Sequence, residues 1–326
     1  RSFFKNIDDQ KDIPETLHEQ MDKIPEDFNF LFVGHWLQGE VGQDRKDVSM
    51  LVKTFIETFK NQENPPGLIL KTSEAGFSVM ERENILKKLD NIKRTCNGEL
   101  PNIYIMYGDL TEDELNGLYN HDKVKVHISF TKGEGFGRPL LEASLSAKPV
   151  MASAYSGQLD FLPKELAILL PGELKEVHKS VVWDKVILKE SKWFTVNYNF
   201  ASAMMKELVK NYSPFEVRAK KLAMLNESKF TYEKMAEKFL DMMDKYVPEM
   251  PTQVQFKMPT LTKIGDINQS DQKLTLPKLK INPGDSLNKG SLEQPEGDLS
   301  VKSTAETDDT PTVKPKLPKL KLAKKE

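Results

Sequence analysis

Short apolar segments typical of buried strands alternate with amphipathic helical segments along most of this chain. The first strand is predicted over 28–34, and the helical pattern of 44–60 that follows it places Val48, Leu51, Val52, Phe55 and Phe59 on one face. Further strands are predicted at 67–72, 102–107, 124–130, 150–153 and 166–170, with helices at 80–94 and from a capping box at 111–114 onward. Strands and helices that alternate at this spacing form a parallel sheet covered on both faces. We therefore predict an α/β fold.

Polar and glycine-containing segments follow several of the predicted strands. They are Gly34 onward, Lys71 with the two residues after it, 108–109, 132–138 and 156–157. Ligands of parallel sheets bind beyond the carboxyl ends of the strands, so these segments predict one site at a shared edge. Lys71 has two readings of equal weight: it contacts a phosphate, or it reaches along the surface to solvent.

The segment 131–142 carries the most specific pattern. Gly133, Gly135 and Gly137 lie between a predicted strand and a helix, where backbone amides can point at an anion without a side chain in the way. Glu134 and Glu142 flank this turn and could accept hydrogen bonds from sugar hydroxyls on either side of a bound diphosphate. The alternative is an ordinary glycine turn, with Arg138 and Glu142 as an exposed ion pair four residues apart on the helix.

At these residues the sequence resembles retaining glycosyltransferases of the GT-B fold, family 4 type, in their nucleotide-sugar-binding half. The segment 134–142 matches the acidic signature of that family and 148–153 matches the strand after it; the resemblance spans about 28–246. It is similar above all to glycosyltransferases carried by large tailed bacteriophages. The resemblance implies a Rossmann-like domain and a hexosyltransferase that uses a nucleotide-diphosphate sugar. It also implies donor contacts from Gly135, Phe136, Gly137 and Arg138, with Glu142 on the ribose and Glu134 on the sugar.

Two cations precede the first helix. Positive groups beside a departing diphosphate stabilise the transition state more than the ground state. The resemblance assigns this role to an arginine and a lysine. Lys46 matches the lysine, while His35 stands where the family has its arginine, so Arg45 is the expected substitute. The alternative is a solvated charge cluster that caps the helix. We expect Glu134, Arg45 and Lys46 to form the catalytic group.

Composition and residue spacing limit the ligands, cofactors and cellular location to be expected. The net charge of −2 does not favour nucleic acid as a ligand, and the single cysteine, Cys96, excludes a disulfide framework. No Asp-x-Asp pair occurs and the histidines lack metal-ligand spacing, so we expect neither a metal nor another cofactor. No apolar run is long enough for a membrane span. These features predict a cytoplasmic protein, in the host cytoplasm if a phage encodes it.

The expected domain organisation has four parts. Residues 1–27 are a linker or the remnant of a missing acceptor domain, since the chain begins at Arg1 without methionine; 28–190 form the nucleotide-sugar-binding domain, and 191–247 are helices. Residues 248–326 read as a disordered tail, because its prolines and lysines leave little apolar surface to bury.

The tail repeats an apolar-Pro-x-Leu-x pattern at 258–262, 276–280 and 317–321. Three such segments could dock a protein partner with avidity, and drift in a lysine-rich tail explains them equally well. Two functions follow. One is a retaining glycosyltransferase, present here without its acceptor domain, whose acceptor is a glycan, modified DNA or a protein. The other is a catalytically inactive binding or structural module recruited through the tail.

Overall fold

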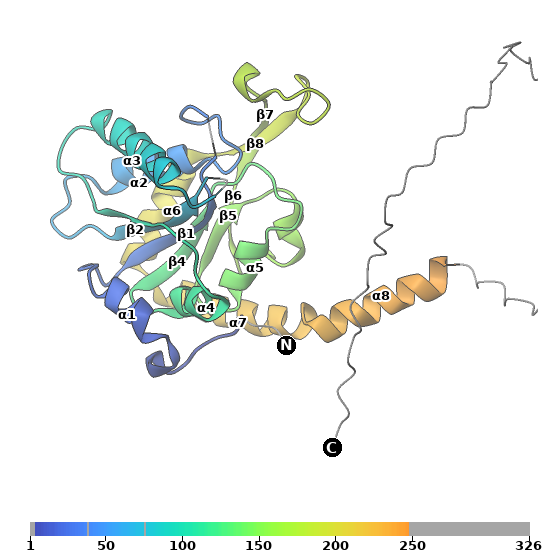
Figure 1. The fold of residues 1–326 in the computed structure, drawn as a ribbon. Coiled ribbons are helices and arrows are strands. Elements are labelled where there is room, and N and C mark those ends of the chain that lie inside the picture. The colour runs from blue at the N-terminus through green and yellow to red at the C-terminus, as the bar shows by residue number, and fades with distance from the viewer. Residues whose placement is uncertain (1–3, 38, 75, 248–326) are drawn as a thin grey trace, which may run out of the picture. The chain divides into compact units, whose positions relative to one another are not determined.

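Six parallel strands form the centre of the structure. The computed structural model describes residues 4–37, 39–74 and 76–247, which belong to the first, Arg1–Thr252, of the two units into which the chain divides. The strands are β1 (Asn29–His35), β2 (Gly67–Ser73), β3 (Ile103–Met106), β4 (Val124–Ser129), β5 (Val150–Ser153) and β6 (Ile168–Leu170). Their order in the sheet is β3-β2-β1-β4-β5-β6 (Figure 1). The predicted α/β fold class is confirmed.

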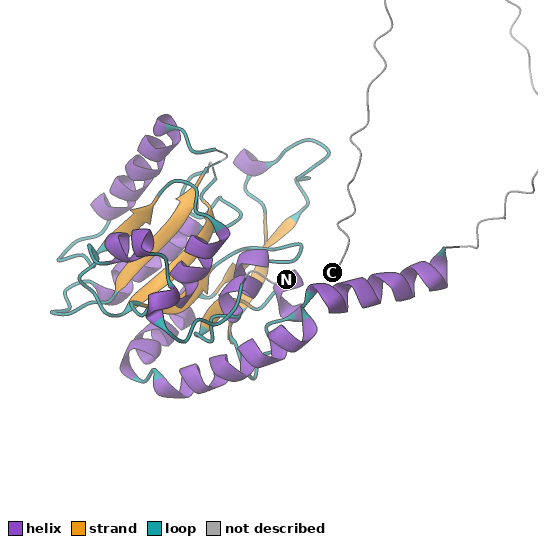
Figure 2. Cartoon of the chain, turned by 60° about the horizontal axis from the view of Figure 1, so that its bottom comes forward, coloured by secondary structure: helices purple, strands orange, loops and turns teal. Residues whose placement is uncertain are grey.

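Helices cover both faces of this sheet (Figure 2). One face packs against α2 (Val48–Phe59), α3 (Val79–Arg94) and α6 (Tyr198–Lys210). The other packs against α1 (Glu15–Met21), α4 (Glu112–Asn120), α5 (Arg138–Ser144) and part of α7 (Ser213–Lys229). Strand β1 shows why both faces close: Phe30 and Phe32 join the first hydrophobic cluster and Leu31 joins the second. Successive side chains of a strand point to opposite faces, so a strand that is apolar throughout must be covered twice.

The first long helix begins later than its periodicity suggests. Helix α2 starts at Val48 and buries all five apolar residues of the predicted face. The residues just before it are not helical, because Asp47 has a left-handed backbone with φ of 54°. The Asp44 carboxylate accepts the Val48 N–H at 3.0 Å, which satisfies one of the unpaired donors at the helix start. Residues 44–47 therefore form a loop segment that leads into the helix.

The N-terminal residues differ from the expected linker. Residues 4–24 pack onto the sheet through the second cluster, where Leu17 and Met21 of α1 are buried together with Ile13 and Ile24. These apolar residues recur three or four positions apart, so they share one side of the segment. The many charged residues between them obscure this spacing in the sequence. The described part of 1–27 is thus a covering layer of the sheet.

The expectation that the chain becomes wholly helical from 191 is wrong. Strands β7 (Gly172–Glu176) and β8 (Lys192–Val196) form an antiparallel pair, and Phe194 and Val196 of β8 pack into the first cluster. The alternation that marks β8 is only two apolar residues long, too short to recognise as a strand. Short 3₁₀ helices lie at Gln10–Asp12, Gly157–Asp160 and Lys179–Val181.

The last described element is α8 (Tyr232–Tyr246), none of whose residues is buried. The predicted tail and its three repeats lie outside the described residues. Within 4–37, 39–74 and 76–247, no helix combines the length and the apolar character that crossing a membrane requires.

Candidate functional site

The order of the strands creates a topological switch point between β1 and β4. The chain leaves β1 for α2 on one face of the sheet, and it leaves β4 for α5 on the other. The loops that follow these two neighbouring strands therefore diverge, and such a switch point is where open α/β sheets bind ligands. The segment 39–47, called here the cation loop, precedes α2, and the segment 130–137, called here the glycine turn, follows β4. These two segments carry the predicted catalytic residues.

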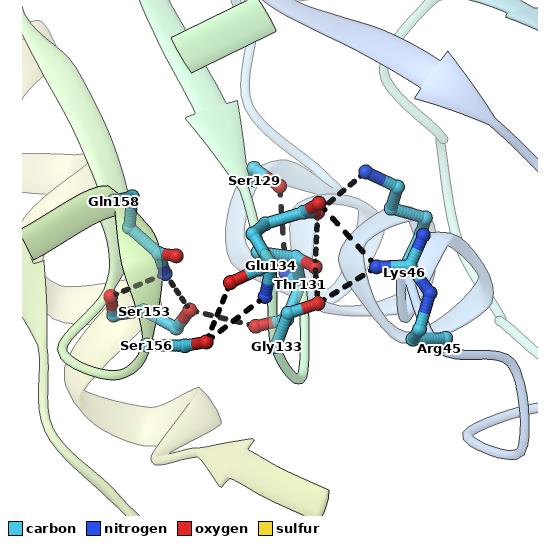
Figure 3. A network of polar contacts seen from close by, with 9 residues as sticks. All are labelled: Arg45, Lys46, Ser129, Thr131, Gly133, Glu134, Ser153, Ser156 and Gln158. Carbon is cyan, nitrogen blue, oxygen red and sulfur yellow. Dashed lines mark hydrogen bonds and ion pairs between the residues drawn. The ribbon is translucent and has the colours of Figure 1, made fainter. Parts of the chain in front are cut away.

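The structure brings all three predicted catalytic side chains together (Figure 3). The Lys46 ammonium donates a hydrogen bond to Oε1 of Glu134. Arg45 reaches the same turn, donating to the Gly133 carbonyl at 2.7 Å and lying 3.4 Å from Oε2 of Glu134. The side chains of Lys46 and Glu134 are both 11% exposed, whereas that of Arg45 is 39% exposed. The cluster thus has an enclosed ion pair with a second cation toward solvent.

The Glu134 carboxylate is held in its charged form. Burial alone would raise the pKa of this carboxyl, but Lys46, the Thr131 hydroxyl and Arg45 together lower the pKa below its ordinary value. Thr131 donates to the same oxygen as Lys46, at 2.6 Å. Hydrogen bonds to an ionised acceptor are stronger than neutral ones, so these donors also orient the carboxylate.

A third segment, which contains Ser156 and Gly157, packs against the glycine turn. The Ser156 hydroxyl donates to the Glu134 carbonyl at 2.6 Å, and Gly157 N–H donates to the same carbonyl at 3.1 Å. A Cβ atom added at Gly157 would lie 2.1 Å from the carbonyl oxygen of Gly135, so only glycine fits there. Gly137 closes the turn with a left-handed φ of 88° as it enters α5. The backbone around Glu134 is therefore set by close packing of two loops.

The second predicted carboxylate, Glu142, is paired within the protein. Its buried carboxylate accepts from Nε of Arg138, whose side chain is 70% exposed, and from the Tyr119 hydroxyl at 3.3 Å. Burial raises the pKa of Glu142, against the opposing effects of Arg138 and Tyr119. The helical Arg138–Glu142 pair weighed as an alternative is thus present. Phe136 is 43% exposed, and its ring lies 5.2 Å from that of Phe161.

Two predicted binding residues lie apart from this cluster. Gly34 is within β1, paired with Thr72 of β2. Lys71 does not reach the glycine turn: its ammonium donates to the Gly108 carbonyl at 2.5 Å and lies 5.5 Å from the ring centroid of Phe77. Lys71 therefore joins the loops after β2 and β3 on the same edge of the sheet.

Some residues that shape the site carried no assigned role in the sequence. Thr131 is a hydroxyl residue in a loop, and a site signal for it comes only from its place beside the glycines. Ser156 belongs to the predicted edge segment 156–157, but its contact with Glu134 was not predicted. Asp47, Lys132 and Tyr198 form a further polar group next to the cation loop. Among the described residues, no group of three or more His, Cys, Asp and Glu side chains is arranged to hold a metal ion.

A cavity of about 630 Å³ lies elsewhere. Its lining includes Asp122 and Lys125, at the beginning of β4, together with the segment 4–8 and α7. It therefore opens at the amino ends of the strands, away from the Glu134 cluster. The cluster itself is an open edge of the sheet, so shape alone does not single it out.

No protein-family model matches this sequence, and no curated protein matches it. Solved structures of similar fold include the C-terminal domain of a glycosyl transferase group 1 family protein, LpcC from Francisella tularensis. It is 14% identical with a TM-score of 0.43, over 73% of this chain and 96% of that one. Alr3699/HepE from Anabaena, in complex with UDP and glucose, is 12% identical with a TM-score of 0.49, over 74% and 54%. Sucrose-phosphate synthase from Thermosynechococcus elongatus is 17% identical with a TM-score of 0.48, over 74% and 51%. The chain spans about half the length of the last two.

Proposed function

We propose that this chain is the nucleotide-sugar-binding half of a retaining glycosyltransferase of the GT-B fold, family 4 type. The observation that carries the proposal is the meeting of Arg45, Lys46 and Glu134 at the switch point between β1 and β4. Two cations and an ionised acceptor at one switch point match the two parts of a nucleotide-diphosphate sugar. The cations suit the diphosphate, and the acceptor suits the hydroxyls of the sugar.

The proposed chemistry begins with an exchange of partners. In the structure Glu134 pairs with Lys46 and lies beside Arg45, so it balances one of their two positive charges. A bound diphosphate takes over this role, which leaves the Glu134 carboxylate to accept hydrogen bonds from sugar hydroxyls. As the bond between the sugar and the diphosphate breaks, negative charge grows on the leaving oxygen. Lys46 and Arg45 then stabilise the transition state more than the bound donor, which is what accelerates the reaction.

The remaining roles follow the resemblance. Glu142 accepts from the ribose hydroxyls after a change of partner from Arg138, and Gly135, Phe136 and Gly137 border the diphosphate. The transferred group is a hexose, the donor binds without a metal, and the acceptor is a glycan, modified DNA or a protein. We extend the proposal to an enzyme of the kind carried by large tailed bacteriophages and located in the cytoplasm.

Calorimetry with nucleoside diphosphates and their sugars tests this assignment. The wild-type chain should bind a member of a panel of UDP, GDP and ADP sugars equally well with and without EDTA. A charge-assisted hydrogen bond contributes about 1.5–3 kcal/mol. Lys46→Met should therefore weaken the binding of the nucleoside diphosphate by about tenfold or more. Glu134→Gln should weaken the binding of the nucleotide sugar more than that of the nucleoside diphosphate, because the proposed partner of Glu134 is the sugar.

Lys123→Met is the matched control. Lys123 is a half-buried lysine at the opposite edge of the sheet, and its ammonium donates to the main-chain carbonyls of Met21 and Ile24. The Lys123→Met protein should bind the donor as tightly as the wild type does. Absence of binding to the whole panel, or equal affinity in Lys46→Met and the wild type, would overturn the proposed function.

A further inference from the structure

One buried lysine connects the cation loop, the glycine turn and β8. Lys132 is 5% exposed and stands two residues before Glu134. Its N–H donates to the Arg45 carbonyl at 2.8 Å, and its own carbonyl accepts the Phe194 N–H at 3.2 Å. Its main chain alone therefore joins all three segments.

The Lys132 side chain reinforces the same connection. Its ammonium donates to the Gly42 carbonyl and lies 3.2 Å from Oδ1 of Asp47. It also lies 5.8 Å from the ring centroid of Trp193 in β8, close enough for a cation–π contact. Both carbonyl and carboxylate partners come from the cation loop, on either side of Arg45 and Lys46. The ammonium thus holds the cation loop on both sides of Arg45 and Lys46.

The Asp47 carboxylate depends on the Lys132 ammonium as its cationic partner. It is fully buried and adjoins Lys46, and its left-handed φ of 54° is uncommon for a residue with a side chain. Its other oxygen accepts the Tyr198 hydroxyl at 2.7 Å. A strained backbone persists only where surrounding contacts hold it, and a buried carboxylate that loses its cation takes up a proton, draws in water or moves outward. Each response removes the ion pair that holds this end of the cation loop beside Lys46.

We propose that the buried Lys132–Asp47 ion pair is a positioning device, which holds the cation loop so that Arg45 and Lys46 face Glu134. The Lys132 ammonium bonds to Gly42 and Asp47 and not to the Glu134 side chain, so it acts through the loop and not on the donor. The inference deepens the proposed function and rests on it for the role of the cations. The arrangement of the cluster, however, can be measured without any ligand.

The test is a ¹³C NMR titration of the Glu134 carboxyl in the unliganded full chain, with Glu134→Gln used to assign the signal. Lys46, Thr131 and Arg45 hold the pKa of Glu134 down. In Lys132→Met the cations should withdraw and this pKa should rise toward the ordinary glutamate value. Lys132→Arg keeps a cation against Asp47 and should restore the wild-type titration. Lys123→Met, the remote control, should leave the titration unchanged even if it lowers the melting temperature.

Donor binding supplies the second readout. Lys132→Met should weaken the best donor of the panel by about tenfold, the same order as losing Lys46 itself, and Lys132→Arg should recover most of that affinity. A folded Lys132→Met protein with the wild-type Glu134 titration would overturn the inference. If Lys132→Met does not fold, Asp47→Asn, which removes the charge at constant shape, must raise the Glu134 pKa instead; an unchanged titration there overturns it equally. A wild-type chain that binds no donor refutes the proposed function, while the titration still decides the positioning role.

Discussion

The residues around Glu134 show that the unliganded site stores its charges in pairs. Glu134 pairs with Lys46 and balances one of the two charges of Lys46 and Arg45, while Asp47 pairs with Lys132 and Arg138 pairs with Glu142. Breaking a buried pair on one side leaves an uncompensated charge, so a ligand that displaces Glu134 is expected to be anionic. The diphosphate of the proposed function meets this requirement, and a neutral sugar does not.

The glycines of the site allow a prediction at the same scale. Gly157→Ala places a Cβ 2.1 Å from the Gly135 carbonyl oxygen, so the glycine turn must shift. Overpacking of this kind costs about 1–3 kcal/mol, and donor binding should fall with it. A Cβ at Gly135 meets no atom within 4 Å. Gly135→Ala should therefore melt like the wild type by differential scanning fluorimetry. Equal melting temperatures for the two variants would contradict the packing described here.

Among the elements, α2 does most to fix the cation loop. Nine of its twelve residues are buried, and its aromatic side chains pack against β1: the rings of Phe55 and Phe30 are 5.8 Å apart in an edge-on contact. Because α2 directly follows Asp47, the packing of this helix fixes where the cation loop ends. The glycine turn has a similar anchor in β4, so two packed elements position the two halves of the site.

The importance of α2 can be measured. Phe55 is fully buried, and replacing such a residue with alanine removes apolar contacts and leaves a cavity. Phe55→Ala should lower the free energy of unfolding by about 3–5 kcal/mol in urea denaturation. Val217→Ala, on the exposed side of α7 with 51% exposure, is the control and should change it little. A loss below that of the control would mean that the α2 contacts do not stabilise the fold.

At the scale of the whole molecule, burial of uncharged histidine links stability to pH. His127 of β4 is buried, with Nε2 3.2 Å from the Ser146 hydroxyl. Burial lowers its pKa from 6.5 to about 3. Below pH 6.5 the unfolded chain binds a proton there and the folded protein does not, so stability falls as the pH falls. The loss continues down to the folded pKa.

The expected size is large enough to detect. Between pH 6.5 and 5 this one group should remove about 2 kcal/mol of stability, at about 1.4 kcal/mol per pH unit. His127→Gln carries no such group, so its free energy of unfolding should fall less over that range by about the same amount. Urea denaturation of both proteins at several pH values measures the difference. Parallel pH profiles would show that His127 is protonated in the folded state.

Much of this molecule follows from local sequence alone. The alternation of apolar strands and amphipathic helices determined the parallel α/β sheet, because a strand that is apolar on both sides needs helices on both faces. The same reasoning placed the cation loop and the glycine turn on one edge, and the pairing of Lys46 with the loop of Glu134 is consistent with that placement. The capping box at Thr111 was equally readable, since its partner Glu114 is three residues away.

Tertiary structure decided the rest. Only the order of the strands makes β1 and β4 neighbours and so joins Lys46 to Glu134, 88 residues apart in sequence. The burial of α1 and the strand character of 192–196 depend on partners distant in the chain, and their own patterns are too short to reveal them. Lys132 is the clearest case. A lysine beside glycines in a loop suggests a solvated charge, and its role emerges only because folding buries it against Asp47, where an unpaired charge could not remain.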